Sequence, residues 1–463
     1  MATRTTQAAA SPTCATVFPA PAGPFQGTVP VPGDKSISQR AAILAAVAAG
    51  ESVLTGYLPS EDCRATLRAL GQLGVESQWE AGTPVVHVHS PGWEGWRESE
   101  DVLDLGNSGT GFRLLTGILA AFPAFSVLTG DASLRRRPMG RVVDPLRRMG
   151  ARIWGRSDGR FAPLAVQGTY LVGQGHLLPV ASAQVKSALL LAGLFARGQT
   201  QIEEPAPSRD HTERLLTWLG LPVEPSKGRR VRVEGVWAAR KVKLSPFHLT
   251  IPADPSSAAF FWALAALRPG SRVTVPGVGI NPTRIAFLHL LEKMGAGVSI
   301  QSERMEGGEP VADVSVEGRE LRGLTVGGAT IPAVIDELPL LAVLASQAQG
   351  RTQVQDAAEL RVKESDRIHG MAEQLGHLGV EVEEKEDGWV IDGPQTLQGG
   401  QVESLGDHRV AMSLAIAAVQ ARQPVTISGI QWVDTSFPGF FERLCQFTHV
   451  EVGDGSGDSS MEK

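Results

Sequence analysis

The sequence predicts an α/β protein of two lobes, each built from three repeated units. Six helical segments are apolar nearly all round, and a helix of that kind must be buried. They recur roughly every 70 to 80 residues, which is the size of one compact α/β unit. A chain of 463 residues is too long for one ordinary core, so two groups of three units are the economical arrangement.

Each unit is expected to contain a buried helix, a short strand, a second amphipathic helix and further strands. The buried helical segments are expected at 41–49, 114–121, 187–196, 258–267, 338–345 and 410–419. The strands that follow most of them are expected at 52–55, 201–203, 272–275, 351–354 and 425–427. The amphipathic helices end at Leu-Gly or Met-Gly, because glycine adopts the left-handed conformation that closes a helix. These glycines are Gly74, Gly150, Gly220, Gly295 and Gly379.

The lobe boundaries follow from where the first and fourth units begin. The first begins near Gly33 and the fourth near Asp254. If the chain starts in one lobe, visits the other and returns, residues 33–252 form one lobe, and 1–32 with 253–463 form the other.

Composition excludes several classes of protein. A net charge of −6 with no long basic run argues against a nucleic-acid binder. Three widely spaced cysteines indicate neither a disulfide framework nor a zinc site. No apolar run is long enough to span a bilayer, and residues 1–24 lack the apolar core of a secretory signal. We therefore expect a cytoplasmic monomer whose ends, 1–16 and 453–463, are disordered tails.

The segment 33–40, GDKSISQR, is the clearest local signal for a ligand. A helix start favours an anion, and Lys35 and Arg40 add full charges. Ser36 and Arg40 are four residues apart and share a helix face. The segment is not a P-loop, because Asp34 stands where that motif has glycine. Taken alone, it fits a phosphate or carboxylate site and a solvated basic helix end equally well.

The other buried helices also begin with ligand-type residues. Ordinary N-capping explains their Ser, Asp and Asn residues. It does not explain Lys35, Arg40, Arg113, Gln184 and Arg409 at corresponding places. If all six helix starts face one cleft, their dipoles and charges converge there, which predicts a cleft for anionic ligands.

Two further segments carry candidate groups. The basic loop 134–141 is stiffened by a proline and is expected to supply at least one functional arginine. The segment 360–367 is expected to open a helix that places Lys363 and Arg367 on one face, with Glu364 beside them. Two cations next to a carboxylate suit proton transfer on a phosphorylated substrate. An exposed helical ion pair is the alternative for the other charged residues of this segment.

Taken together, these segments resemble the 5-enolpyruvylshikimate-3-phosphate (EPSP) synthase family, which joins shikimate 3-phosphate to phosphoenolpyruvate and releases phosphate. The resemblance rests on motifs along nearly the whole chain: GDKSISQR at 33–40, LGNSGTGFR at 105–113, RRPMG at 136–140, SAQVKSALLLAGL at 182–194, IDELPLLAV at 335–343, RVKESDR at 361–367, GDHRVAM at 406–412 and TSFPGF at 435–440. It implies a two-lobed inside-out α/β barrel. Each lobe would hold three βαβαββ units with buried parallel helices, and the cleft would lie between the lobes.

The resemblance also implies roles for individual residues. Phosphoenolpyruvate would contact Lys35, Gly109, Arg137, Gln184, Arg367 and Arg409. Shikimate 3-phosphate would contact Lys35, Ser36, Arg40, Ser182, Ala183, Gln184, Arg209, Asp336 and Lys363. Asp336 would take the proton of the attacking 5-hydroxyl, and Lys35 and Glu364 would handle the proton at the methylene carbon. These small molecules are the expected partners, with no metal and no cofactor. For His408, help with these proton transfers and a structural hydrogen bond are equally good interpretations.

The sequence departs from part of that family, and alternatives remain at this level. Thr435-Ser436 replaces a lysine found in many members, and Ala183 replaces a serine, which resembles the branch associated with glyphosate tolerance. Gly109, however, is the small residue of sensitive members, so we expect glyphosate to bind. The sister enzyme that acts on UDP-N-acetylglucosamine usually has a cysteine in the loop matching 134–138, and none is present. A non-catalytic anion-binding repeat protein is the other alternative.

Overall fold

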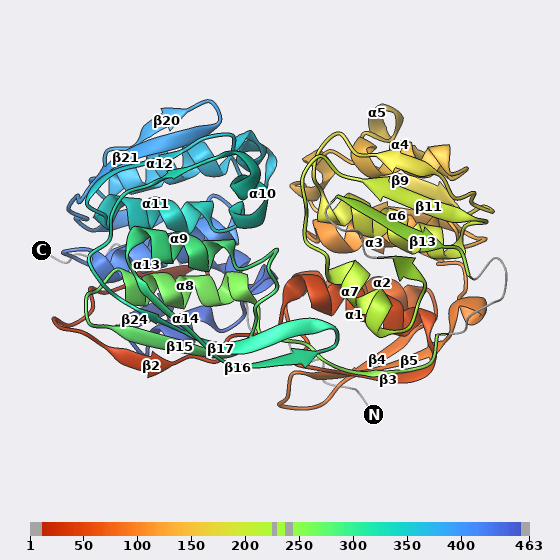
Figure 1. Ribbon diagram of the computed structural model, residues 1–463, viewed down its shortest axis with the longest axis horizontal. Helices are drawn as coiled ribbons and strands as arrows, with labels where there is room; N and C mark the ends of the chain where they lie inside the picture. Colours follow the sequence, from red (N-terminus) through yellow and green to blue (C-terminus); the bar gives the residue numbers. More distant parts are fainter. Residues whose placement is uncertain (1–11, 225–228, 237–243, 455–463) are drawn as a thin grey trace, which may run out of the picture.

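The computed structural model describes residues 12–224, 229–236 and 244–454. It is a mixed α/β molecule of two lobes that lie side by side (Figure 1). One lobe holds the green-to-blue part of the chain together with the red strand β2 (Gln26–Thr28). The other holds the orange, yellow and light-green part.

Six four-stranded sheets repeat one strand order, and within the described ranges none of them closes into a barrel. In each sheet the first two strands are parallel and the remaining neighbours are antiparallel. The sheets of one lobe are β14 (His248–Thr250), β3 (Ala49–Thr55), β5 (Val85–Pro91), β4 (Glu76–Trp79); β6 (Leu103–Asp104), β7 (Phe125–Thr129), β9 (Phe161–Gln167), β8 (Arg152–Gly155); and β10 (Gly175–Leu177), β11 (Gln199–Glu203), β13 (Arg230–Glu234), β12 (Val223–Glu224). Those of the other lobe are β2, β15 (Arg272–Gly279), β17 (Glu309–Glu317), β16 (Gly297–Glu306); β18 (Thr325–Val326), β19 (Gly350–Val354), β21 (Gly388–Gly393), β20 (Glu383–Lys385); and β22 (Gly400–Glu403), β23 (Val425–Ser428), β1 (Cys14–Val17), β24 (Val450–Gly453).

Each unit contributes one central helix and one outer helix. The central helices are α1 (Lys35–Val47), α3 (Gly109–Leu119), α6 (Ala183–Phe195), α8 (Pro255–Ala266), α11 (Leu338–Gln347) and α13 (His408–Gln420). The outer helices are α2 (Glu61–Gln72), α4 (Gly140–Arg148), α7 (His211–Trp218), α9 (Ala286–Met294), α12 (Arg367–His377) and α14 (Phe440–Leu444). Two single turns, α5 (Arg156–Gly159) and α10 (Ile331–Val334), complete the set in the described residues. All six predicted buried helices and the five predicted helix-ending glycines, each with positive φ, are confirmed.

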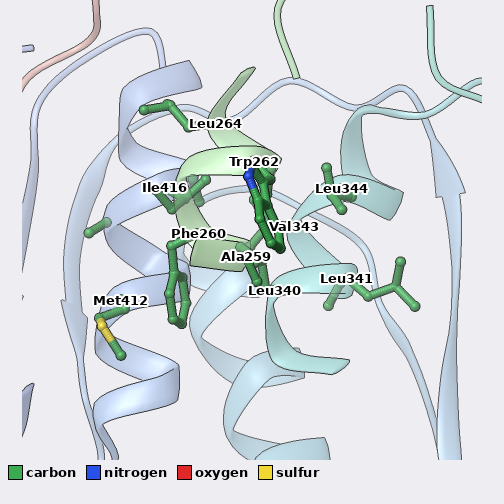
Figure 2. Packing of buried hydrophobic residues seen from close by; sticks show 14 of the residues in the cluster. Ala259, Phe260, Trp262, Leu264, Leu340, Leu341, Val343, Leu344, Met412 and Ile416 are labelled. Carbon is green, nitrogen blue, oxygen red and sulfur yellow. The ribbon is translucent and has the colours of Figure 1, made fainter. Parts of the chain in front are cut away.

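The apolar residues form two separate cores. One draws on residues 15–31 and 258–447, and the other on residues 37–251. Figure 2 shows the first core, where Trp262 of α8 lies between apolar side chains of α11 and α13. Trp262 is buried, and its indole nitrogen donates to the carbonyl oxygen of Val314 at 3.4 Å. Burial on all sides explains why these helices show no polar face.

The chain crosses between the lobes twice, and the two crossings lie side by side. The N–H of Asp34 donates to the carbonyl of Pro252 at 2.8 Å, and the N–H of Asp254 donates to that of Pro32 at 2.9 Å. A Cβ on Gly33 would lie 1.8 Å from the carbonyl oxygen of Gly56, so only glycine fits at this crossing.

The expected tails need correction. Cys14–Val17, part of which was expected to be disordered, is the strand β1 between β23 and β24, and Gly453 is the last residue of β24. Ala15 and Val17 are fully buried, so this strand completes a core that the sixth unit alone would leave open. The rest of the expected tails, 1–11 and 455–463, lies outside the described residues.

No single helix in the described part of the chain has the length and apolar character that a membrane crossing requires. One bent pair, Gly328–Val334 with Leu338–Gln347, meets that requirement by length and composition only.

Candidate functional site

A cavity of about 380 Å³ lies between the lobes, where the central helices begin. Its wall contains residues from the starts of helices in both lobes and from the loops beside them. Every residue predicted from the sequence to bind or act on a ligand lines it: Lys35, Ser36, Arg40, Gly109, Arg137, Ser182, Ala183, Gln184, Arg209, Asp336, Lys363, Glu364, Arg367 and Arg409.

The convergence of helix starts on this cavity is confirmed. Side-chain oxygens cap the N-termini of five central helices, and these capping residues are Asp34, Ser108, Ser182, Asp254 and Asp407. The remaining central helix, α11, begins two residues after Asp336. Because the positive ends of the helix dipoles point at one space, an anion is favoured there before any side chain is counted.

Asp336 lies among cations from both lobes. Arg209 of one lobe pairs with its carboxylate, and Arg367 of the other lies 3.5 Å from it. Burial would raise the pKa of Asp336, but Arg209, Lys363 and Arg409 outweigh burial and hold that pKa well below its usual range. The carboxylate is therefore ionised in the ligand-free cavity.

Glu364 lines the same cavity from the loop before α12 and is likewise paired with arginines. Its carboxylate lies 2.8 Å from Arg367 and 3.4 Å from Arg137, which belongs to the opposite lobe. Burial acts to raise its pKa, but Arg367, Arg137 and His408 lower it well below the usual value. Both carboxylates thus start as proton acceptors, and each is bound by an arginine from each lobe.

The prediction that the segment 360–367 opens a helix is wrong about where that helix starts. A 3₁₀ turn covers Ala358–Val362, Lys363 is extended, and α12 begins only at Arg367. Asp366 sets this start, because its carboxylate accepts the N–H groups of Ile368 and His369. Lys363 and Glu364 therefore reach the cavity from a loop.

Asp62 is a residue of the site that sequence reasoning missed. Its carboxylate is 3.1 Å from the Nζ of Lys35, and it lines the cavity. Burial raises the pKa of Asp62, with Lys35 opposing that shift. Ser60-Glu61-Asp62 reads as an ordinary acidic first helical turn, since Ser60 caps α2. Nothing in the local sequence marks Asp62 as the partner of a lysine.

Arg40 is more enclosed than the sequence indicated. It is 3% exposed and donates to the carbonyl oxygen of Ser36, to the hydroxyl of Thr212 at 2.7 Å and to that of Ser187 at 2.8 Å. Burial lowers the pKa of Arg40 to about 10, which is still high enough for the guanidinium to stay charged at neutral pH. Arg40 nevertheless lines the cavity.

Gln184 and His408 are also held in place. Gln184 accepts from Arg113 and donates to Thr110 at 2.9 Å. Burial, together with Lys35 and Arg409, lowers the pKa of His408 well below its usual value, so its imidazole is neutral at pH 7. No group of three or more His, Cys, Asp or Glu side chains in the described ranges is arranged to hold a metal ion.

These features define a class of protein: a two-lobed α/β protein with a cationic cleft for anionic ligands and two carboxylates at its centre. The solved enolpyruvyl transferase NikO from Streptomyces tendae has the same fold, with a TM-score of 0.75 at 17% identity over 96% of this chain and 99% of that one. The EPSP synthase from Acinetobacter baumannii is nearer, with a TM-score of 0.83 at 41% identity over 95% and 99% of the two chains.

The EPSP synthase (3-phosphoshikimate 1-carboxyvinyltransferase) family model matches residues 19–444. The curated 3-phosphoshikimate 1-carboxyvinyltransferase of Syntrophotalea carbinolica is 50% identical over 91% of this chain and 96% of its own. That of Anaeromyxobacter sp. (strain K) is 49% identical over 96% and 99%. The chain therefore belongs to the EPSP synthase family.

Proposed function

We propose that this cavity transfers the enolpyruvyl group of phosphoenolpyruvate to the 5-hydroxyl of shikimate 3-phosphate. The hydroxyl oxygen adds to C2 of phosphoenolpyruvate while C3 gains a proton, which gives a tetrahedral intermediate. Loss of a proton from the new methyl group then expels phosphate and restores the double bond. The reaction belongs to the shikimate pathway of aromatic amino-acid biosynthesis.

The observation that carries the proposal is the pair of ionised carboxylates, Asp336 and Glu364, inside a ring of cations from both lobes. The two substrates bring two phosphates and one carboxylate, and the intermediate keeps all of them. Arginines bind such groups through two parallel hydrogen bonds, so the ring can hold this charge while the closed lobes exclude water.

Substrate binding gives Asp336 its basicity in this proposal. In the free cavity Arg209 and Arg367 are its partners. An arriving phosphate competes for those arginines, and the pKa of Asp336 then rises toward its normal value. Asp336 is thereby prepared to accept the proton of the 5-hydroxyl at the moment that hydroxyl attacks.

The proton at the methylene carbon requires an acid and a base in turn. We assign these steps to Lys35 and Glu364, which come from different lobes. The Nζ of Lys35 is a proton donor that Asp62 holds at 3.1 Å, and the carboxylate of Glu364 is ionised and can accept. A donor and an acceptor on either side of one carbon suit addition followed by elimination.

The two substrate subsites follow the expectations from sequence. Phosphoenolpyruvate binds Lys35, Gly109, Arg137, Gln184, Arg367 and Arg409. Shikimate 3-phosphate binds Lys35, Ser36, Arg40, Ser182, Ala183, Gln184, Arg209, Asp336 and Lys363. Their common position in one cavity wall supports a single site that holds both substrates side by side.

A phosphate-release assay tests the function. The purified protein is given phosphoenolpyruvate with shikimate 3-phosphate, and separately with UDP-N-acetylglucosamine. We expect phosphate only with the first acceptor. Release with the second acceptor, or with neither, would contradict the proposal.

The lobe boundaries, oligomeric state and location form part of this proposal. Lobes of 33–252 and of 1–32 with 253–463 are supported by the separate memberships of the two apolar cores. A monomer suffices, because all the cavity residues named above come from one chain. We place the enzyme in the cytoplasm, free of membranes and nucleic acid, where size-exclusion chromatography and cell fractionation can test it.

A further inference from the structure

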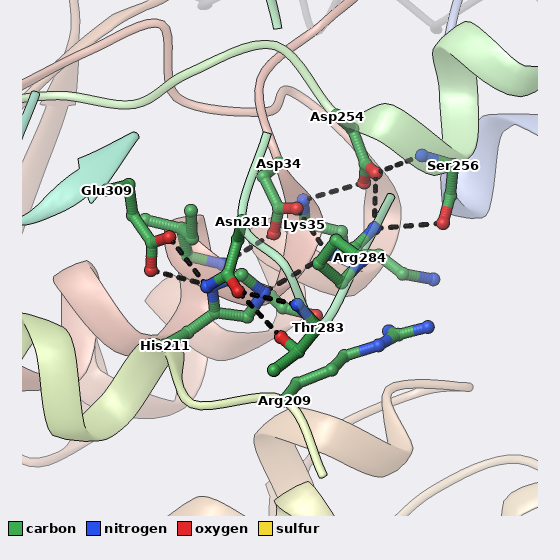
Figure 3. Close-up of polar contacts among 12 residues, drawn as sticks. Asp34, Lys35, Arg209, His211, Asp254, Ser256, Asn281, Thr283, Arg284 and Glu309 are labelled. Carbon is green, nitrogen blue, oxygen red and sulfur yellow. Dashed lines mark hydrogen bonds and ion pairs between the residues drawn. The ribbon is translucent and has the colours of Figure 1, made fainter. Parts of the chain in front are cut away.

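Arg284 lies between the two lobe crossings, outside every motif that the sequence singled out. It precedes α9, is 5% exposed, and forms the centre of the polar network in Figure 3. Its two terminal nitrogens carry four N–H groups. They face four acceptors: Asp34 at 2.6 Å, His211 at 3.2 Å, Asp254 at 2.8 Å and Ser256 at 2.9 Å.

Two of these acceptors also hold the first turn of α1. Asp34 accepts Arg284 with one oxygen and the N–H of Ile37 at 2.9 Å with the other. Asp254 accepts Arg284 with one oxygen and the N–H of Lys35 at 3.2 Å with the other. A single guanidinium of one lobe is thus joined, through two carboxylates, to the turn of the other lobe that carries Lys35.

The cluster has little freedom to rearrange. Burial would raise the pKa of Asp34, but Arg284 opposes it and holds that pKa well below the usual range, so the carboxylate stays charged. Because a guanidinium can only donate, Nε2 of His211 accepts from Arg284, and Nδ1 then donates to Glu309 at 2.8 Å. Buried charges that satisfy one another in this way have few alternative positions.

Within its own lobe, the network also reaches the residue next to Asp336. The hydroxyl of Ser256 accepts from Arg284 and donates to the carboxylate of Glu337, the residue that follows Asp336. Arg284 therefore has a hydrogen-bonded connection to the start of α1, which holds Lys35, and another to Glu337, the N-cap of α11, which directly follows Asp336.

We propose that Arg284 is a positioning residue that sets Lys35 against Asp336 by fixing the N-termini of α1 and α11 to each other across the lobe junction. This inference rests on the proposed function, since it assigns Arg284 to the accuracy of that reaction. Arg284 lines the substrate cavity, but its terminal nitrogens already donate to four groups of the protein. In this assignment it therefore binds neither substrate and acts through Asp34, Asp254 and Ser256.

The test compares Arg284→Lys with the matched control Arg214→Lys. Arg214 lies at the same junction, where it is 2.9 Å from Asp210 and 3.9 Å from Glu309. Among the described residues, none of its hydrogen bonds or ion pairs reaches α1. Lysine keeps the charge at position 284 but cannot bind two carboxylates in one plane. We expect kcat for phosphate release to fall about 100-fold, as for a catalytic group misplaced by about 1 Å, with both KM values within about threefold. The control should keep kcat within about twofold of the wild-type value.

A double-mutant cycle separates positioning from general support of the fold. In single-turnover measurements, Arg284→Lys should slow the Lys35→Met enzyme less than about threefold, because a residue that acts through Lys35 loses its effect when Lys35 is absent. If the losses multiply instead, or if Arg284→Lys lowers the melting temperature and leaves kcat unchanged, the proposal is wrong. A rise in the KM for shikimate 3-phosphate with unchanged kcat would make Arg284 a direct ligand, which also overturns it.

The proposal can still be tested if the lysine variant does not fold, and it can be separated from the proposed function. If Arg284→Lys does not fold, Asp254→Asn keeps the size of the capping side chain and removes its charge toward Arg284, and it should lower kcat about tenfold. Unchanged kcat in that variant contradicts the proposal. Wild-type enzyme is assayed in parallel, because a wild type that releases no phosphate refutes the proposed function itself.

Discussion

Gly109 is the position where one methyl group should change substrate binding without harming the fold. It is the first residue of α3, and its backbone φ is not in the left-handed region. A Cβ there would lie 2.9 Å from a terminal nitrogen of Arg137 and 3.3 Å from one of Arg113. An ordinary contact needs about 3.5 Å, so Arg137 would have to move by about 0.6 Å.

The magnitude follows from the hydrogen bond that we assign between Arg137 and phosphoenolpyruvate, because this movement of Arg137 would weaken it. A hydrogen bond to a charged group contributes about 1.5–3 kcal/mol, and about 1.4 kcal/mol corresponds to a factor of ten. We therefore expect Gly109→Ala to raise the KM for phosphoenolpyruvate about 10- to 100-fold, while the KM for shikimate 3-phosphate stays within about threefold. Steady-state phosphate release with each substrate varied in turn measures both values.

Gly71→Ala is the matched control. Gly71 lies in α2, and an added Cβ would meet no atom within 4 Å. The change should raise the free energy of unfolding by up to about 1 kcal/mol, through helix propensity, and leave both KM values unaltered. An unchanged KM for phosphoenolpyruvate in Gly109→Ala, or equal rises for both substrates, would refute the reasoning about Arg137.

Four further predictions use the same protein. With Gly109 intact, glyphosate should inhibit in competition with phosphoenolpyruvate, and tolerance to millimolar glyphosate would contradict this. Glu364→Gln should bind both substrates by calorimetry as the wild type does, yet lose at least about 100-fold in kcat, because an amide cannot accept the proton. The pKa values of Asp336 and Glu364 are held below those of the unfolded chain, so their stabilising effect is complete above about pH 5. It is lost as the pH falls further, toward the lowered pKa values of the folded state. Urea unfolding from pH 7 to pH 3 should therefore show a shallower loss of stability in Asp336→Asn than in the wild type, and equal losses would contradict this. Trp262→Ala should lower the free energy of unfolding by about 3–5 kcal/mol, because the fully packed core in Figure 2 cannot close over the space left; a loss below about 1 kcal/mol in denaturant titration would count against that packing.

The helices and the membership of the site could be predicted because their signals are local. Apolar composition on all sides marked the buried helices, and a glycine after leucine or methionine marked the ends of the outer ones. Lysine and arginine at helix starts, where capping does not require them, marked the cavity. The prediction failed at the start of α12, because the capping carboxylate of Asp366 stops the helix from extending back to Lys363. It failed again at β1, since a four-residue strand has too little pattern to stand out from a polar tail.

The pairings inside the site could not be predicted in the same way. Asp62 and Arg284 carry no motif, and their partners are set by how distant segments meet. Arg284 and Asp34 are 250 residues apart in the chain, and Arg209 and Asp336 are 127 apart. Such contacts depend on the relative position of the two lobes, and the residues next to them in the sequence do not indicate that position.

By itself, the sequence determined the repeated unit, the six buried helices and the set of charged residues gathered at their starts. Only the tertiary structure decided which carboxylate faces which cation, and that Asp62 holds Lys35 while Arg284 joins the two lobe crossings. The physical reason is the range of the interactions. Periodicity and capping act over one or two helical turns, whereas the pKa and orientation of a buried charge depend on every group that folding brings around it.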